Sequence, residues 1–409
     1  MPNSEFLAVT FPTLKPGVNF LNQGSEIYIG LANRGISIGS QQKSLARSLL
    51  DLCDGSRSLA NIYQNLESQV WLNASFDSNL DSNLDSNLDS NLDSNLIKGE
   101  INWILEVLTQ AGLIEFRKSA LNEFESKYHP INLVNAKRRM QTQENLTTWH
   151  PDINSQNSAE DLIARRQQFS IIIFGHNHLA LTIFTLLAAS GFSQIRLIDR
   201  SIPQNKVDSI QIAPEEVCGL AIRGSDVGIR RQLVIADLAR NSRLLVGEEQ
   251  SFPAVPNFII STDEIPQETL QRWMSEEISH LAISKLIEHT IEIGPIVIPG
   301  KSPCLNCLKL WRSETFPLHK EFELIYALDK NKNPRVEIPP AQVAAVAGMI
   351  AIAVIEYFAA LQIGSNSIGK NLIGVTRTLD LFDPMNPQNP TNSNNYWQPH
   401  SYCGCQQLI

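Results

Sequence analysis

The sequence lacks the features of membrane-spanning, secreted and nucleic-acid-binding proteins. It has no uninterrupted apolar run of about 18 residues; the longest, Val343 to Ala360, contains Glu356 and favours a buried helix. Residues 1–5 offer neither a basic start nor an apolar signal core. The formal net charge is −9, which gives no electrostatic reason to expect nucleic acid or an anionic membrane as a partner. We therefore predict a cytoplasmic protein with no membrane and no nucleic acid among its partners.

Cysteine is also scarce, with six residues in a chain of 409. This number is too small for a disulfide scaffold, and in a reducing compartment paired cysteines are more typical of metal sites. The apolar content of 43% is ordinary for a globular protein, and the length is enough for two or three domains.

The first part of the chain has the pattern of a small α+β domain. Three short β-like runs, Val18 to Leu21, Glu26 to Ile29 and Gly35 to Ile38, are separated by turn residues. Helices are expected over residues 45–52, from the N-cap Ser58 onward and over residues 101–111, with a closing strand over 113–116. This order predicts a winged-helix-like domain over residues 1–118.

A low-complexity insert interrupts that domain. Residues 77–96 are Asp-Ser-Asn-Leu repeated five times, and Asp, Ser and Asn favour turns and caps over helix interiors. We expect a solvated, mostly disordered loop between two helices. Calcium binding is an alternative, although the spacing does not match a known calcium loop. Residues 119–168 are expected to be a polar linker, with a mobile stretch over 154–161.

The remainder has the pattern of a Rossmann-like α/β domain over residues 169–409. Ser170 to Phe174 is a buried strand, Leu179 to Ser190 an apolar helix, and Gln194 to Ile198 a strand that ends in Asp199. Further strands are expected over residues 258–261, 280–284, 288–293 and 296–298, with helices over 266–274 and 340–358.

Four cysteines form two short motifs far apart in the sequence, Cys304-x-x-Cys307 and Cys403-x-Cys405. Together they would give a structural zinc ion four thiolates with no open position, and the metal would hold the C-terminal tail on the domain. Two unrelated buried pairs, a redox Cys-x-x-Cys or an iron–sulfur centre are the alternatives. A thioredoxin-type motif should open a helix directly after a strand, whereas this one follows a loop over residues 299–303.

The two remaining cysteines, Cys53 and Cys218, have no partner nearby in the sequence. We interpret both as buried spectators. Cys218 as a thioester-forming nucleophile is the alternative.

Several motifs of the second half carry a family resemblance. They are Gly294 to Gly300, Pro303 to Leu308, Trp311-Arg312 and Pro399 to Cys405. With these motifs, residues 169–405 resemble the ThiF-like, ubiquitin-activating-enzyme-like superfamily, and most of all its branch in thiazole/oxazole-modified peptide biosynthesis. Residues 1–118 resemble the PqqD-like precursor-peptide recognition element of the same pathways, through residues 15–18, 52–57 and 108–114.

Active members of this superfamily bind ATP and adenylate a C-terminal carboxylate, using a Gly-x-Gly-x-x-Gly turn that cradles phosphates. Here the turn runs from Gly175 to Ala180 and keeps only its first glycine; we expect Asn177 to be able to adopt a left-handed backbone there. We interpret its two histidines, His176 and His178, as surface residues, with metal ligation as the alternative.

The other nucleotide contacts of the family are also altered. Asp199 stands where the family holds a ribose, with a helix-cap role as the alternative, and Arg231 stands where a phosphate-binding lysine is expected. The family's arginine finger is missing from the region of Ser209 to Ala213. We therefore predict a degenerate, non-adenylating site formed by Gly175, Asn177, Asp199 and Arg231, without ATP as a cofactor.

The resemblance implies a leader-binding scaffold subunit without catalytic activity of its own. The leader would add a strand to Gly35, Ile36, Ser37 and Ile38 and pack on the helix that carries Ile104 and Leu108. A YcaO cyclodehydratase, which makes azolines from Cys, Ser or Thr with ATP, would be a separate chain, because this one stops four residues after Cys405. A homodimer through the second domain is expected.

Two other functions stay open from the sequence. One is a true adenylating enzyme with an unusual phosphate loop. The other is a nicotinamide-dependent oxidoreductase on the same layout, against which the missing second glycine argues.

Overall fold

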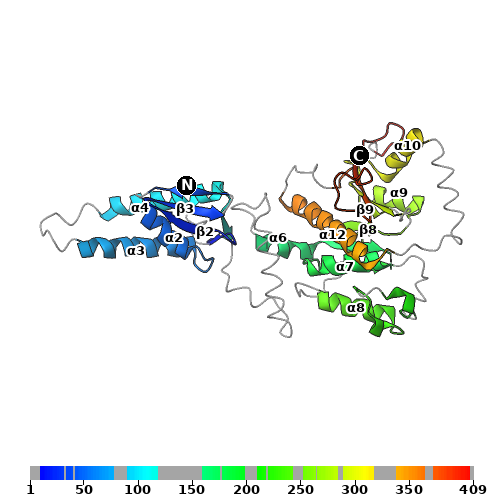
Figure 1. The fold of residues 1–409 in the computed structure, drawn as a ribbon, viewed down its shortest axis with the longest axis horizontal. Coiled ribbons are helices and arrows are strands. Elements are labelled where there is room, and N and C mark those ends of the chain that lie inside the picture. The colour runs from blue at the N-terminus through cyan, green and yellow to red at the C-terminus, as the bar shows by residue number, and fades with distance from the viewer. Residues whose placement is uncertain are drawn as a thin grey trace. The chain divides into compact units, whose positions relative to one another are not determined.

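The structure is a computed structural model with two compact units, Met1–Ile163 and Ala164–Ile409, each with its own core (Figure 1). It describes residues 10–31, 34–39, 42–77, 90–117, 159–175, 177–198, 210–217, 220–242, 252–263, 265–283, 289–316, 338–363 and 372–405.

The first unit contains a three-stranded antiparallel sheet. Its strands are β2 (Asn19–Gln23), β3 (Glu26–Leu31) and β4 (Arg34–Ile38), in the order β2-β3-β4. The three predicted strands are therefore confirmed, with ends shifted by a few residues. A glycine is needed at position 35 because the ring of Tyr28 fills the space that a Cβ there would occupy. Strand β4 lies at an edge of this sheet.

Three helices cover this sheet: α2 (Lys43–Leu52), α3 (Leu59–Asp77) and α4 (Ser90–Gln110). The Ser58 hydroxyl accepts the Asn61 N–H at 3.3 Å, as expected of an N-cap. After α4, strand β5 (Ile114–Arg117) pairs antiparallel with β1 (Phe11–Leu14). Strand β1 was not predicted, because it contains a proline and is only four residues long.

The repeat insert joins α3 to α4, as predicted. Residues 78–89 lie outside the described part of the chain, but residues 90–96 are helical and begin α4. The loop prediction is therefore wrong for this last part. A helix already stabilised by packing at its C-terminal half can extend through weak helix formers, because elongation costs far less than nucleation.

The end of the expected linker is also helical. Helix α6 (Ala159–Arg165) and a 3-10 turn over Arg166–Gln168 precede the second unit's first strand, while residues 118–158 lie outside the described part. The apolar side chains of Leu162 and Ile163 are buried, and the Arg166 guanidinium donates to the Ser190 carbonyl at 2.8 Å. These contacts give this stretch tertiary support that its polar composition did not indicate.

The second unit has a seven-stranded mixed sheet in the order β12-β11-β10-β9-β8-β6-β7. Four strands are parallel: β6 (Ser170–Phe174), β7 (Gln194–Ile198), β8 (Phe258–Ser261) and β9 (Ser279–Ile283). Three continue it antiparallel: β10 (Thr290–Val297), β11 (Val375–Asp380) and β12 (Ser393–Tyr396). The two strands predicted over residues 288–298 are one strand, β10, with a register irregularity between Ile293 and Ile296.

Helices cover both faces of this sheet. Helices α7 (His178–Ala189) and α12 (Pro340–Ile363) pack together on the face that carries Ile171 and Ile173 (Figure 1). Helix α9 (Gln267–Ser275) packs on the other face, against Phe174 and Ile259. Alternate residues of the central strands thus feed two cores, which explains why these strands are apolar throughout.

Two further helices were not predicted from the sequence. Helix α8 (Arg231–Ser242) packs on α7, and α10 (Leu305–Thr315) follows the first cysteine motif. Helix α12 is the one described helix that is long and apolar enough to cross a membrane. Half of its most apolar stretch is buried, as in the core helix of a globular domain.

Candidate metal centre and phosphate turn

The structure brings all four predicted cysteines together. Cys304 is the N-cap of α10 and Cys307 lies in its first turn, while Cys403 and Cys405 flank Gly404 in a tight turn of the C-terminal tail. Gly404 has φ +69°, a backbone conformation that glycine adopts without strain. The Sγ–Sγ distances are 3.8 Å for Cys304–Cys307, and 3.4 Å for both Cys304–Cys403 and Cys307–Cys405.

This cluster fits one tetrahedral metal ion. All four sulfurs lie within 4.8 Å of one another, and a Zn–S bond of about 2.3 Å places tetrahedral sulfurs roughly 3.8 Å apart. A cluster of several irons sets metal and sulfide ions between the thiolates and needs a wider spacing. The alternative of two unrelated cysteine pairs is thereby excluded. One detail differs from the sequence analysis, since the Cys-x-x-Cys motif does open a helix, although a loop precedes it.

Two of the four cysteine sulfurs accept hydrogen bonds from N–H groups. The backbone N–H of His400 donates to Cys307 Sγ, and Asn306 Nδ2 donates to Cys403 Sγ, both at 3.3 Å. The hydrogen bond from Cys304 lowers the pKa of Cys307 to about 4, whereas burial raises the pKa of Cys405 to about 11. A bound metal ion would remove the remaining protons, because coordination deprotonates a thiol outright.

The C-terminal tail is also tied to α10 by contacts of Trp311 and His400, two residues of the family motifs whose contacts were not predicted. Trp311 Nε1 donates to the Gln398 carbonyl at 2.9 Å. His400 Nε2 lies 3.0 Å from Glu314 Oε1, and its ring packs edge-on against Trp311 at 4.7 Å between centroids. No spacing rule points to these residues, because each contact joins positions more than 80 apart in the sequence.

Asn177 and Thr262 occupy the space beside Gly175, between β6 and α7. Gly175 has φ +130°, and the Thr262 hydroxyl fills the space where a Cβ at Gly175 would lie. Asn177 is the N-cap of α7: its side chain accepts the Ala180 N–H at 2.9 Å and donates to Thr262 Oγ1 at 3.1 Å. The expectation of a left-handed backbone at Asn177 is wrong, because its φ of −71° and ψ of 170° are extended, as N-caps require.

Arg231 begins α8 and is engaged by an acidic side chain. Its guanidinium forms an ion pair with Glu216, which lies in a 3-10 turn over Pro214–Glu216. The carboxylate thereby neutralises the charge that a phosphate would need. Asp199, His176, Cys218 and residues 201–209 lie outside the described part of the chain. Cys53, by contrast, is buried in the core of the first unit, as predicted.

The residues predicted to bind a leader peptide divide into two groups. Gly35 and Ser37 are exposed on β4 and Ile36 is half-buried, whereas Ile38 is buried. Ile104 and Leu108 are 0% exposed and belong to the core of the first unit. Their assignment to a peptide contact is therefore corrected: the stripe that they form on α4 is its core face.

The opposite side of α4 is the accessible one. Trp103 is 46% exposed, and together with Leu96, Gly99 and Glu100 it lines a shallow pocket of about 420 Å³ that Gln42 completes. Gln42 lies just beyond the end of β4.

No family model and no curated protein sequence matches this chain. Solved structures do match it. The E. coli enzyme MccB with AMPCPP and MccA has a TM-score of 0.54 at 13% identity, over 97% of this chain and 99% of that one. The microcin C7 biosynthetic enzyme MccB with N-formylated MccA gives 0.54 at 12% identity, with the same coverage. The heterocyclase TruD gives 0.52 at 10% identity, over 97% of this chain but 42% of TruD.

The chain has the fold of MccB and TruD. This agrees with the fold that the resemblance in the motifs implied. At 10–13% identity the likeness concerns the fold, so the chemistry has to be argued from the residues of this chain.

Proposed function

We propose that the chain is a leader-peptide-binding, non-catalytic subunit of a ribosomal-peptide cyclodehydratase complex. It is a soluble, cytoplasmic scaffold that presents the precursor to a separate YcaO-type enzyme, which forms azolines from Cys, Ser or Thr with ATP. The proposal is supported by the fold shared with MccB, which was solved with MccA, and with the heterocyclase TruD.

The non-catalytic part of the proposal is supported by the contacts in the turn between β6 and α7. In an adenylating relative the first N–H groups of the helix are left for phosphates. Here Asn177 bonds to the Ala180 N–H, and the Thr262 hydroxyl fills the space beside Gly175. Arg231 is held by Glu216. A triphosphate would have to displace these contacts to reach the Ala180 N–H and the Arg231 guanidinium.

An adenylating enzyme is the second candidate, because MccB was also solved with ATP. ATP–pyrophosphate exchange in the presence of a precursor peptide separates the two. We expect no exchange and no heat on titration of the chain with magnesium-ATP. Exchange that depends on the peptide's C-terminal carboxylate would overturn the non-catalytic role.

The edge position of strand β4 supports the peptide-binding part of the proposal. It is an edge strand with exposed Gly35 and Ser37, so its outward N–H and C=O groups offer a template for one more strand. The pocket beside Trp103 would receive a side chain of the added strand.

Proline substitutions in β4 of the full chain test strand addition. Alternate N–H groups of an edge strand point away from the sheet, so one of the neighbours Ile36 and Ser37 presents its N–H outward. Of Ile36→Pro and Ser37→Pro, we expect one to keep the melting temperature of the wild type yet lose binding of a fluorescein-labelled leader peptide by polarisation. The other proline breaks pairing with β3 and lowers the melting temperature. Unchanged leader binding in both variants would rule out this mode.

The proposal also includes a bound metal ion and a homodimer. Four thiolates with no open position support a structural Zn²⁺ as the metal. The homodimer would form through the second unit, where Ile352 and Leu361 of α12 are 61% and 55% exposed.

A further inference from the structure

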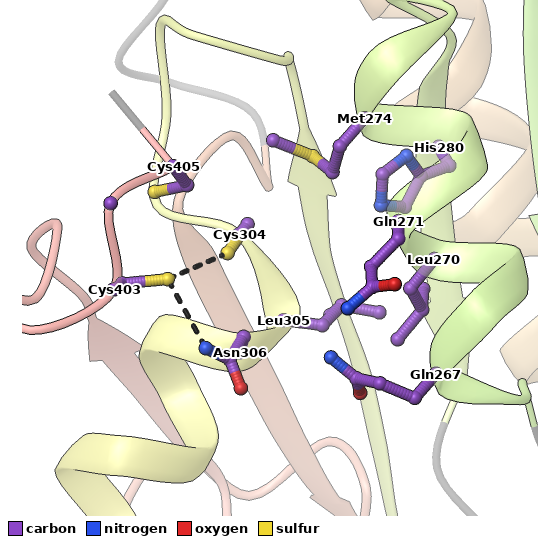
Figure 2. Close-up of a pocket in the computed structure, with 11 residues that line it drawn as sticks. Gln267, Leu270, Gln271, Met274, His280, Cys304, Leu305, Asn306, Cys403 and Cys405 are labelled. Atoms are coloured by element: carbon purple, nitrogen blue, oxygen red, sulfur yellow. Dashed lines mark hydrogen bonds between the residues drawn. The ribbon is translucent and has the colours of Figure 1, made fainter. Parts of the chain in front are cut away.

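A pocket of about 340 Å³ lies between α9 and the two cysteine motifs (Figure 2). Its walls come from α9, from His280 on β9, from the start of α10 and from the turn at Gly404. None of the residues that line it belongs to the phosphate turn, so it is a different site. Its volume is at the lower end of the range for ligand sites, about 300–1,000 Å³, which suits a short segment rather than a folded partner.

Apart from the cysteines of the tetrad, the pocket carries no charged side chain. Its lining contains no Asp, Glu, Lys or Arg. Burial lowers the pKa of His280 to about 4, so this ring is neutral at neutral pH. Its Nδ1 lies 2.9 Å from the Ile278 carbonyl and carries the proton there, which leaves Nε2 as an acceptor. A metal ion with four thiolates would add negative charge nearby, so phosphates and carboxylates would find no counterion here.

The polar groups of the pocket are amides. Gln267 and Gln271 lie one turn apart on α9, and their side chains face Asn306 across the pocket in Figure 2. The Asn306 amide nitrogen donates to Cys403 Sγ, so its oxygen is the group that can accept. Side-chain amides both donate and accept, as peptide groups do, and therefore match an extended backbone.

An apolar part lies beside these amides. Leu270 and Met274 from α9 and Leu305 from α10 line it. A methionine adapts its shape to different partners, so this part can accept apolar side chains of several forms.

The metal centre assembles the pocket. One wall begins at Cys304 and the other is the turn from Cys403 to Cys405, and these segments, about 100 positions apart, meet at the tetrad. Without the ion, the second wall is held only by hydrogen bonds and packing of the tail.

We propose that this pocket is a second peptide site, which binds an uncharged, extended segment with an apolar side chain and exists only in the metal-loaded protein. Resting on the proposed function, we assign this segment to the part of the precursor that follows the leader. The metal would then be structural for the fold and, through the pocket, necessary for holding the substrate.

Methionine-methyl NMR of the full, zinc-loaded chain provides the test. The chain has five methionines, and of the described Met274, Met349 and Met385 only Met274 lines the pocket; a Met274→Leu variant assigns its signal. The probe is a mixture of capped hexapeptides made from Ala, Gly, Ser, Asn and Leu. We expect the Met274 methyl signal to shift with the mixture while those of Met349 and Met385 stay. No shift at millimolar peptide, or a shift caused by ATP instead, would overturn the proposal.

Two matched comparisons sharpen this result. The variant Gln267→Ala/Gln271→Ala keeps good helix formers on an exposed face and should bind about tenfold more weakly, as expected for two lost hydrogen bonds. Arg272→Ala on the same helix, whose ion pair with Glu276 is exposed, should bind as the wild type does. Chelation of the metal should abolish the Met274 shift, and a shift that survives both chelation and the double substitution would contradict the proposal.

Leader binding, measured by polarisation on the same preparations, separates this inference from the proposed function. A Met274 response without leader binding supports the pocket and rejects the leader-binding scaffold. Leader binding without a Met274 response supports the scaffold and rejects the pocket.

Discussion

At the scale of single residues, a few side chains decide whether the second unit can do chemistry. Asn177 stands at the second glycine position of a nucleotide-binding turn, and it caps α7 instead of leaving the helix open to a phosphate. The missing glycines are visible in the sequence. The contact with Thr262 is not, because it joins positions 85 apart through the pairing of β6 with β8.

Gly175 is expected to tolerate no side chain. Its φ of +130° is unfavourable for other residues, and the Thr262 hydroxyl fills the Cβ position. Gly175→Ala should lower the free energy of unfolding by about 1–3 kcal/mol, measured by urea unfolding. Gly348→Ala is the matched control: this glycine lies in α12 with open space around it, and alanine there should stabilise by up to about 1 kcal/mol. Equal effects of the two substitutions would contradict the described turn.

His280 gives a prediction on pH. The unfolded chain takes up this proton near pH 6.5, whereas burial lowers the folded pKa to about 4. The unfolded state therefore binds more protons between these values, so the free energy of unfolding falls as the pH drops from about 6.5 to 4, by on the order of 3 kcal/mol. In an NMR titration, the ring signals of His280 should not change between pH 8 and 5. A midpoint near 6.5 would show that the ring is not buried.

At the scale of elements, prediction succeeded where the pattern is local. The strands of the first unit, the βαβ start of the second and the α12 helix follow from periodicity and turn residues. Strand β12, Ser-Asn-Asn-Tyr, was missed because it has little strand propensity and is held by pairing with β11, which was also not predicted. The prediction that Ile104 and Leu108 contact the peptide was wrong, because an apolar stripe on a helix indicates in the first place the face that packs in the core.

The two cysteine motifs connect the start of α10 with the C-terminal tail. Their spacing alone was enough to predict that the four cysteines form one cluster. Cys403→Ser should remove one ligand and lower the metal content below one ion per chain, measured by elemental analysis. The tail should then become sensitive to protease, because its remaining ties are the hydrogen bonds to α10. Cys53→Ser, which changes a cysteine in the other unit, is the control and should keep the metal. Full metal content in Cys403→Ser would show that the tail does not ligate the ion.

At the scale of the whole molecule, the chain joins a small unit with an open edge strand to an α/β unit in which Asn177 caps the first helix of the expected phosphate turn. The sequence was sufficient to predict that the four cysteines come together, because this prediction rests on short motifs. It was not sufficient for the pocket beside the tetrad, whose lining comes from α9, β9, α10 and the tail. Such a site becomes visible only when the segments are placed in space.

Reconstitution with a precursor peptide, ATP and a YcaO-type enzyme tests the central claim most directly. Mass spectrometry of the precursor follows the reaction, since each ring formed removes one water. We predict ring formation only when both proteins are present, a strong decrease with the leader-binding-deficient β4 proline variant, and no ATP consumption by the chain alone. Adenylation of the precursor by the chain alone, or equally fast ring formation by the YcaO-type enzyme without it, would contradict the account.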